Sequence, residues 1–235
     1  MCVGSAKLSA AAQPEASGSC ETEGMYSPAA FREARPEIIE AAMAAHPLAT
    51  LVTMGPRGLD ASHLPLLYSR AEGGPGILRG HMARANPQWQ DYPPDTEALA
   101  IFSGPQHYVS PGWYPSTREH GKVVPTWNYV TVHAHGRLTF QTETEWLLEN
   151  VKALTERQEE SREMPWRVAD APAEFIENSL RAIVGVELTI TRLEGKWKVS
   201  QNRTAADREG VIAGLQGLGS PGACEMAKLV KERLG

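Results

Sequence analysis

Residues 123–140 alternate two kinds of side chain, and this pattern limits the possible fold more than any other feature of the sequence. Successive side chains of an extended strand point to opposite faces. One face of this segment carries apolar residues suited to a core: Val130, Val132, Ala134, Leu138 and Phe140. The opposite face carries aromatic and polar residues: Trp127, Tyr129, Thr131, His133, His135 and Arg137. The pattern predicts one long strand whose mixed face contacts a flat ligand or a second subunit. The alternative is a strand covered by the protein's own helices.

The other strand-like segments follow one another instead of alternating with helices. Short apolar segments occupy residues 49–54, 59–68, 77–81 and 98–104, and helical patterns lie at the start, middle and end of the chain. This order favours an antiparallel barrel over a parallel, doubly wound sheet. With 42% hydrophobic and 22% charged residues, the chain has the composition of a globular protein. The expected fold is therefore mainly β with flanking helices.

Glycine and proline positions refine this expectation. Residues 184–201 are predicted to form a hairpin that turns at Glu194 and Gly195. Pro65 has no backbone donor, so its strand is predicted to lie at a sheet edge or a bulge.

The chain is predicted to divide into three parts. Residues 1–24 are small and polar without periodicity, which is typical of a disordered tail. Residues 25–219 are predicted to form the main domain. Ser220 and Pro221 are a helix-start signal, so residues 220–235 are predicted to form a C-terminal helix.

Composition and charge exclude several classes of protein. The net charge is −5, whereas proteins that bind nucleic acid directly usually carry a basic surplus. The three cysteines, Cys2, Cys20 and Cys224, form no CxxC motif, which argues against a disulfide framework or a zinc ribbon. No apolar run reaches the length of a membrane span, and the N-terminus is a poor signal peptide. We expect a cytoplasmic protein that does not bind membranes.

Several side chains suit a flavin mononucleotide site. His81, Arg84 and Lys122 can supply positive charge for the phosphate. Trp127 and Leu64 can supply an apolar slot for the ring, and the amides of Asn128 and Gln201 can pair with its polar edge. The alternative for the phosphate-binding residues is that Arg84 pairs with an acidic side chain and His81 only ends a strand.

Two other chemistries compete with this hypothesis. His133 and His135 share a strand face two residues apart, but two histidines alone are a weak metal signal, and no metal is expected. The sequence has no GxSxG motif for a nucleophilic serine, and its one cysteine outside the tail, Cys224, lies in an alanine-rich helical segment. Nucleophilic catalysis is therefore not expected.

Four blocks of the sequence carry a resemblance to a known family. These blocks are SHLPLL (62–67), GHMARANPQW (80–89), HGKVVPTWNY (120–129) and SQNRTAADREGVIAGL (200–215). They resemble the signature blocks of PaiB-type FMN-binding proteins, a family of negative transcriptional regulators of protease synthesis and sporulation. The resemblance runs from about Met25 to Leu215. Gly112 and Thr117 depart from the family pattern, in which serine and lysine are expected.

The resemblance implies a split β-barrel of the pyridoxamine-oxidase kind, assembled as a homodimer with FMN at the interface. His81 and Arg84 match the phosphate-side motif, and Lys122, Trp127 and Asn128 match the strand that faces the partner. The blocks also contain two further residues of the predicted cofactor site, His63 and Asn86.

Three functions remain open from the sequence. The leading one is an FMN-binding regulator that acts indirectly, since the last two helical segments are a poor helix-turn-helix with few basic residues. The second is a flavin-dependent oxidoreductase acting on a small substrate, with His63, His120 and Tyr129 as candidate acids or bases. The third is a flavin-free interaction domain that keeps the fold.

Overall fold

The computed structural model describes residues 24–94 and 96–233, and its centre is an eight-stranded antiparallel sheet. The strand order is β3-β2-β6-β7-β8-β5-β4, and β1 pairs with β8. The strands are β1 (Arg32–Glu33), β2 (Leu48–Gly55), β3 (Gly58–Pro65), β4 (Leu67–Ala71), β5 (Gly74–Ala83), β6 (Ala98–Val109), β7 (Thr126–Gln141) and β8 (Ile183–Lys198). The α-helices are α1 (Pro36–Ala45), α2 (Ser116–Glu119), α3 (Thr144–Glu159), α4 (Ala173–Arg181), α5 (Ala205–Leu218) and α6 (Pro221–Glu232). The 3-10 turns are η1 (Ala29–Phe31), η2 (Pro87–Trp89), η3 (Pro111–Trp113) and η4 (Val168–Asp170).

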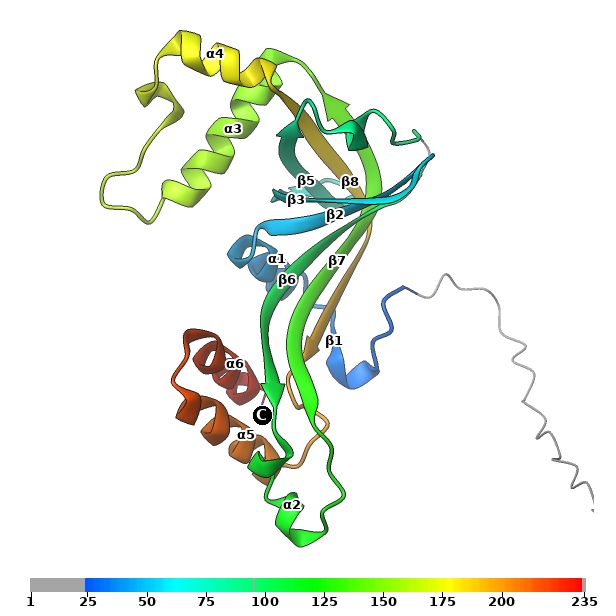
Figure 1. Ribbon diagram of the computed structural model, residues 1–235, viewed down its shortest axis with the longest axis vertical. Coiled ribbons are helices and arrows are strands. Elements are labelled where there is room, and N and C mark those ends of the chain that lie inside the picture. The colour runs from blue at the N-terminus through cyan, green and yellow to red at the C-terminus, as the bar shows by residue number, and fades with distance from the viewer. Residues whose placement is uncertain (1–23, 95, 234–235) are drawn as a thin grey trace, which may run out of the picture.

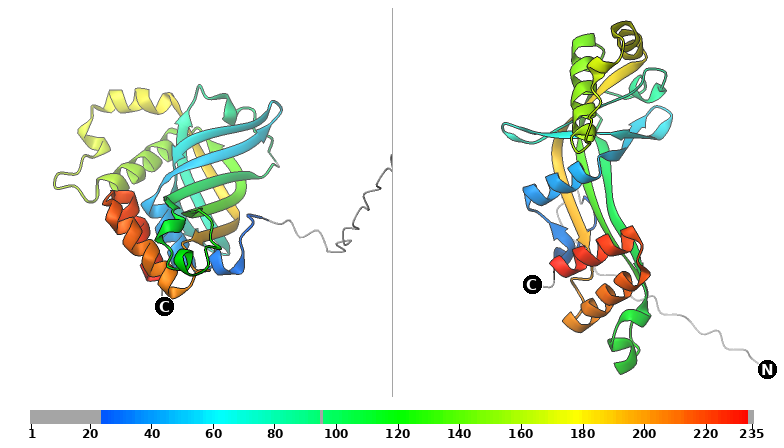
Figure 2. Two further views of the ribbon diagram at one scale, coloured as in Figure 1. Left: turned by 60° about the horizontal axis from the view of Figure 1, so that its bottom comes forward. Right: turned by 90° about the vertical axis from the view of Figure 1, so that its left-hand side faces the viewer.

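The longest strands run almost the full length of the molecule and separate two groups of helices. In Figure 1, α3 and α4 lie at the top, and α2, α5 and α6 lie at the bottom. In the left-hand view of Figure 2, the strands curve around one another and α3 to α6 lie along the left side of the sheet. Within the described part of the chain, no helix combines the length and apolar character needed to cross a membrane.

The long predicted strand is confirmed as β7, although it begins at Thr126 and not at residue 123. Its apolar face is the core face, because Val130, Val132 and Ala134 are all buried. The side chains of the opposite face are partly or fully exposed. The alternation therefore predicted correctly which side of the strand faces the core.

The predicted hairpin at Glu194 and Gly195 is wrong, because β8 is one continuous strand. Gly195 stays in the sheet, opposite Val132 on one side and Glu33 on the other. A Cβ atom on Gly195 would lie 3.0 Å from the backbone oxygen of Glu33. The glycine thus allows β1 to approach β8 closely and does not form a turn.

Pro65 lies in β3, which is an edge strand of the sheet, as its missing donor predicted. The next strand, β4, starts two residues later. The backbone oxygen of Pro65 approaches Gly80 of β5, where an added Cβ would lie only 2.6 Å away. Gly80 therefore lets β5 pass close to the end of β3, and this approach curls the sheet toward a barrel.

The final helix, α6, is part of the same core as the strands. Ala223, Met226, Ala227 and Val230 are buried on one side of this helix. The predicted tail, residues 1–24, lies outside the described residues apart from Gly24.

A buried carboxylate ties β1 to the end of α6. Glu33 is only 4% exposed and accepts hydrogen bonds from Arg35, at 2.6 and 2.8 Å, and from Arg233. The bonds from Arg35 and then from Arg233 lower the pKa of Glu33 from 4.5 to about 2, although burial acts in the opposite direction. Because the folded pKa lies below the usual value, the ionised carboxylate stabilises the fold above pH 4.5. That contribution is lost as the pH falls toward about 2.

We expect Glu33→Gln to lower the free energy of unfolding by about 3 kcal/mol at neutral pH, since each pKa unit corresponds to about 1.4 kcal/mol. Urea unfolding at several pH values measures this loss, which should shrink between pH 4.5 and about pH 2. Glu177→Gln, on the exposed side of α4, is the control and should change stability by less than about 0.5 kcal/mol. A loss of unfolding free energy that does not depend on pH would contradict the lowered pKa of Glu33.

Candidate functional site

The nine predicted cofactor residues form two groups near opposite ends of the long strands. The upper group is His63, Leu64, His81, Arg84 and Asn86, and the lower group is Lys122, Trp127, Asn128 and Gln201. Arg84 lies beside Ala182, just before β8, and the start of β8 pairs with the end of β7. Trp127 lies at the other end of β7, a 16-residue strand that spans about 50 Å at 3.3 Å per residue. One chain therefore does not bring the two groups together (Figure 1).

Arg84 is the cation of the upper group. Its backbone N–H donates to Ala182 O at 2.8 Å, and its Nε donates to Ile183 O at 3.2 Å. Among the described residues, no acid forms an ion pair with its guanidinium. The terminal amino groups of Arg84 can therefore bind an anion without first breaking a salt bridge.

Asn86 connects the segment after β5 to β3. Its Nδ2 donates to Ser62 Oγ at 2.8 Å, and its Oδ1 accepts from Gln88 N at 2.9 Å. The same strand β3 carries the buried Leu64 and the exposed His63. Ser62 was not among the predicted site residues, although it begins the SHLPLL block. Because Asn86 Oδ1 accepts from the backbone N–H of Gln88, that N–H is not available to bind a phosphate.

His81 does not add a second positive charge. Burial lowers the pKa of its imidazole, so the ring is neutral at neutral pH. Its Nδ1 lies 3.4 Å from Nδ2 of Asn150 on α3. Arg84 is thus the charged member of the upper group, and His81 offers a neutral hydrogen-bonding ring beneath α3.

Trp127 provides the apolar surface of the lower group. Its side chain is 48% exposed, and its Nε1 donates to Gln106 Oε1 at 3.1 Å. The ring of Tyr108 meets it edge-on, with centroids 6.1 Å apart. Lys122 is exposed in the loop that leads into β7. The lower group can therefore present an oriented aromatic surface with a cation nearby.

The two amides of the lower group are used within the chain. Asn128 is 1% exposed and donates from Nδ2 to Ser200 Oγ at 2.9 Å. Gln201 accepts from Val199 N at 2.7 Å and donates to Trp197 O. Because neighbours on a strand point in opposite directions, Asn128 faces away from the side on which Trp127 is exposed. In this structure both amides hold the end of β8 in place.

Comparison with known proteins decides the family. Residues 25–192 match the family described as "Putative FMN-binding domain". The chain belongs to this FMN-binding family. It is 33% identical to "Protease synthase and sporulation protein PAI 2" of Bacillus subtilis, over 89% of this chain and 98% of that protein. It is also 34% identical to "Uncharacterized protein AN0679" of Emericella nidulans, over 89% of this chain and 97% of the other. The predicted PaiB-type resemblance is confirmed.

A solved structure supports the fold of the FMN-binding family. The FAD and heme binding protein from Mycobacterium smegmatis aligns with a TM-score of 0.53 and 18% identity, over 72% of this chain and 73% of that one. The predicted fold, a mainly β split barrel with flanking helices, is confirmed. The predicted flavin cofactor is confirmed by the match to the FMN-binding family.

The side chains present fit FMN in their chemistry. Arg84 has no acidic partner among the described residues and suits a phosphate, and the half-exposed Trp127 suits a flat ring. These two requirements are met in different places of one chain.

We expect Asn128→Ala to reduce stability by about 1–3 kcal/mol, because Ser200 Oγ would remain buried without its partner. The matched variant Ser200→Ala removes the same hydrogen bond from the other side and should cost a similar amount. Neither variant should change FMN affinity more than about twofold, as measured by fluorescence titration. If Asn128→Ala alone weakens FMN binding, its amide contacts the cofactor.

Proposed function

We propose that this protein binds FMN as a homodimer, with each cofactor held between the upper group of one copy and Trp127, with the nearby loop residue Lys122, of the other. The observation that carries this proposal is the separation of Arg84 and Trp127 along a strand of about 50 Å, which far exceeds the length of a mononucleotide. A second copy placed in the opposite direction brings a lower group beside each upper group. The site is incomplete without it.

The mixed face of β7 supports a dimer. Tyr129, Thr131, His133 and His135 are only partly exposed, and Trp127 is about half exposed. Aromatic residues are enriched in the cores of protein interfaces, and charged residues other than arginine are depleted there. These four residues lie next to Trp127 on the same face of β7. One dimer interface would therefore cover the whole face and place Trp127 against the partner chain.

Each residue has a definite part in the proposed site. Arg84 neutralises the phosphate, while Ser62 and Asn86 hold the segment after β5 against β3. Trp127 of the second copy covers the ring and excludes water from it. The bound flavin itself supplies one- or two-electron redox chemistry.

We further propose a cytoplasmic, regulatory role that does not involve direct DNA contact. The relative in Bacillus subtilis carries a name that refers to protease synthesis and sporulation. The apolar face of α6 is buried in the core, and its Lys228 pairs with Glu232 at 4.0 Å, so this helix is a poor reader of DNA. Flavin absorbance that bleaches with NADH or NADPH would instead favour an oxidoreductase.

We expect Arg84→Ala to weaken FMN binding about ten- to a hundredfold, because a charge-assisted hydrogen bond is worth about 1.5–3 kcal/mol. Riboflavin lacks the phosphate, so its affinity should hardly change. Fluorescence titration of both ligands measures the difference. The control is Arg79→Ala, on β5, the strand that leads into the turn with Arg84; Arg79 is paired with Glu187, so this variant should bind both ligands normally. Equal losses for FMN and riboflavin would mean that Arg84 only supports its loop.

We expect mixed dimers to recover binding that neither variant has alone. A dimer of one Arg84→Ala chain and one Trp127→Ala chain contains one site with both native residues and one site with neither. Co-expressed, differently tagged chains should therefore bind FMN at native affinity with half the native stoichiometry. If both residues serve the same chain's site, the mixed dimer should show only the weakened affinities of the two variants. A stable monomer in light scattering at micromolar concentration would contradict the whole assembly.

A further inference from the structure

Two histidines and a glutamate form a cluster on the outer face of the long strands. His133 and His135 lie on the same face of β7, and Glu194 of β8 pairs directly with His133 in the sheet register. One potential ligand atom of each side chain lies within 4.8 Å of the others. The cluster is part of neither the upper nor the lower group.

We propose that His133, His135 and Glu194 bind one first-row transition metal ion, with Zn²⁺ as the representative ion. This site goes beyond the proposed FMN function and uses none of the predicted cofactor residues. Two imidazole nitrogens and one carboxylate suit Zn²⁺, Fe²⁺ or Co²⁺, whereas Mg²⁺ and Ca²⁺ prefer ligand sets made only of oxygen.

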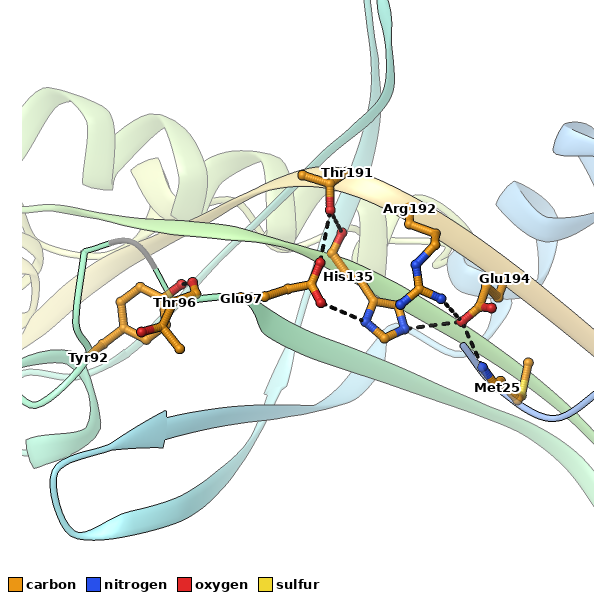
Figure 3. Close-up of polar contacts among 8 residues, drawn as sticks. All are labelled: Met25, Tyr92, Thr96, Glu97, His135, Thr191, Arg192 and Glu194. Atoms are coloured by element: carbon orange, nitrogen blue, oxygen red, sulfur yellow. Dashed lines mark hydrogen bonds and ion pairs between the residues drawn. The ribbon is translucent and has the colours of Figure 1, made fainter. Parts of the chain in front are cut away.

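His135 is already oriented as a metal-bound histidine would be. Its Nε2 lies 3.1 Å from Glu194 Oε2, and its Nδ1 lies 3.5 Å from Glu97 Oε2 (Figure 3). Histidines that bind metals usually donate the other ring N–H to a carboxylate or carbonyl, which fixes the ring and its tautomer. Thr191 Oγ1 lies 3.3 Å from Glu97 Oε1 and so helps to hold that carboxylate. Glu97 is therefore the outer partner, and Nε2 is the ligand atom.

Glu194 keeps one oxygen available. Its Oε2 accepts from Met25 N at 3.2 Å and lies 2.7 Å from Arg192 Nη1, in addition to its contact with His135. Its Oε1 makes no hydrogen bond with any described residue. Arg192 and Met25 thus hold the carboxylate, and Oε1 can bind the ion.

His133 is half-buried and lies on the same face of β7 as His135. No described residue forms a hydrogen bond with the ring, whose centroid lies 6.4 Å from that of His135. Its nitrogen lone pair is therefore available.

The geometry needs only a small adjustment. Zinc bonds to nitrogen and oxygen are about 2.0–2.2 Å long, so tetrahedral ligand atoms lie about 3.4 Å apart. Rotation of the three side chains can reduce the present separations, which reach up to 4.8 Å, to that value. Three protein ligands leave one coordination position for water or for a group from the second copy.

The test uses the full protein, freed of metal by a chelator and then titrated calorimetrically with Zn²⁺. We expect one Zn²⁺ per chain, and His133→Ala, His135→Ala and Glu194→Gln should each weaken binding at least about tenfold. Glu97→Gln should also weaken it about 10- to 100-fold, since outer partners of ligating histidines typically have effects of this size. The matched control is His107→Ala, which removes a half-buried histidine on β6 outside the cluster and should leave binding normal.

FMN affinity measured on the same samples separates this site from the flavin site and reports any variant that fails to fold. X-ray absorption of the native protein with one equivalent of Zn²⁺ should show two imidazole ligands, which keeps the proposal testable even if a variant is unstable. Absence of saturable binding, a spectrum without histidine scattering, or an equal loss in His107→Ala would overturn the proposal.

Discussion

The pairing of β7 with β6 on one side and β8 on the other determines where every other element of this protein can lie. These two ladders occupy almost all of the 16 residues of β7. The β8 ladder shifts by one residue after His135, where Thr191 has no direct partner and Gly136 pairs with Ile190. A Cβ on Gly136 would lie 2.2 Å from Thr189 O, so only glycine fits there. The resulting bulge places the Thr191 hydroxyl 3.3 Å from both His135 O and Glu97.

The length of this strand also has a consequence for cofactor binding. A small barrel could surround a ligand with its own side chains, but a strand of about 50 Å puts its first and last residues at opposite ends of the molecule. Arg84, the proposed phosphate contact, then lies near the end of β7, and Trp127 lies near its start. In the proposed homodimer, a two-fold axis would bring the opposite ends of the two β7 strands together.

Much of this fold could be predicted because its strands alternate cleanly. The faces of β7 follow from the two-residue period, and the same period also implied that Asn128 and Trp127 point to opposite sides. Other features depend on partners that are distant in sequence. Gly195 has the local signature of a turn, yet β1, some 160 residues earlier in the chain, occupies the space beside it. Ser62 gave no signal of its own, since its role depends on a hydrogen bond from Asn86, which lies in the segment after β5.

The two lysines on the outer face of β8, Lys196 and Lys198, make their contacts within the chain. Lys196 is buried, and its Nζ donates to Tyr26 O at 2.6 Å and lies 5.6 and 5.5 Å from the ring centroids of Tyr26 and Tyr129. Lys198 donates to Trp127 O at 2.9 Å and lies 6.0 Å from the same Tyr129 ring. These contacts hold the aromatic row in one orientation. Both ammonium groups are thus engaged with carbonyl oxygens and aromatic rings of the chain itself, on the face of the sheet that the proposed dimer would cover.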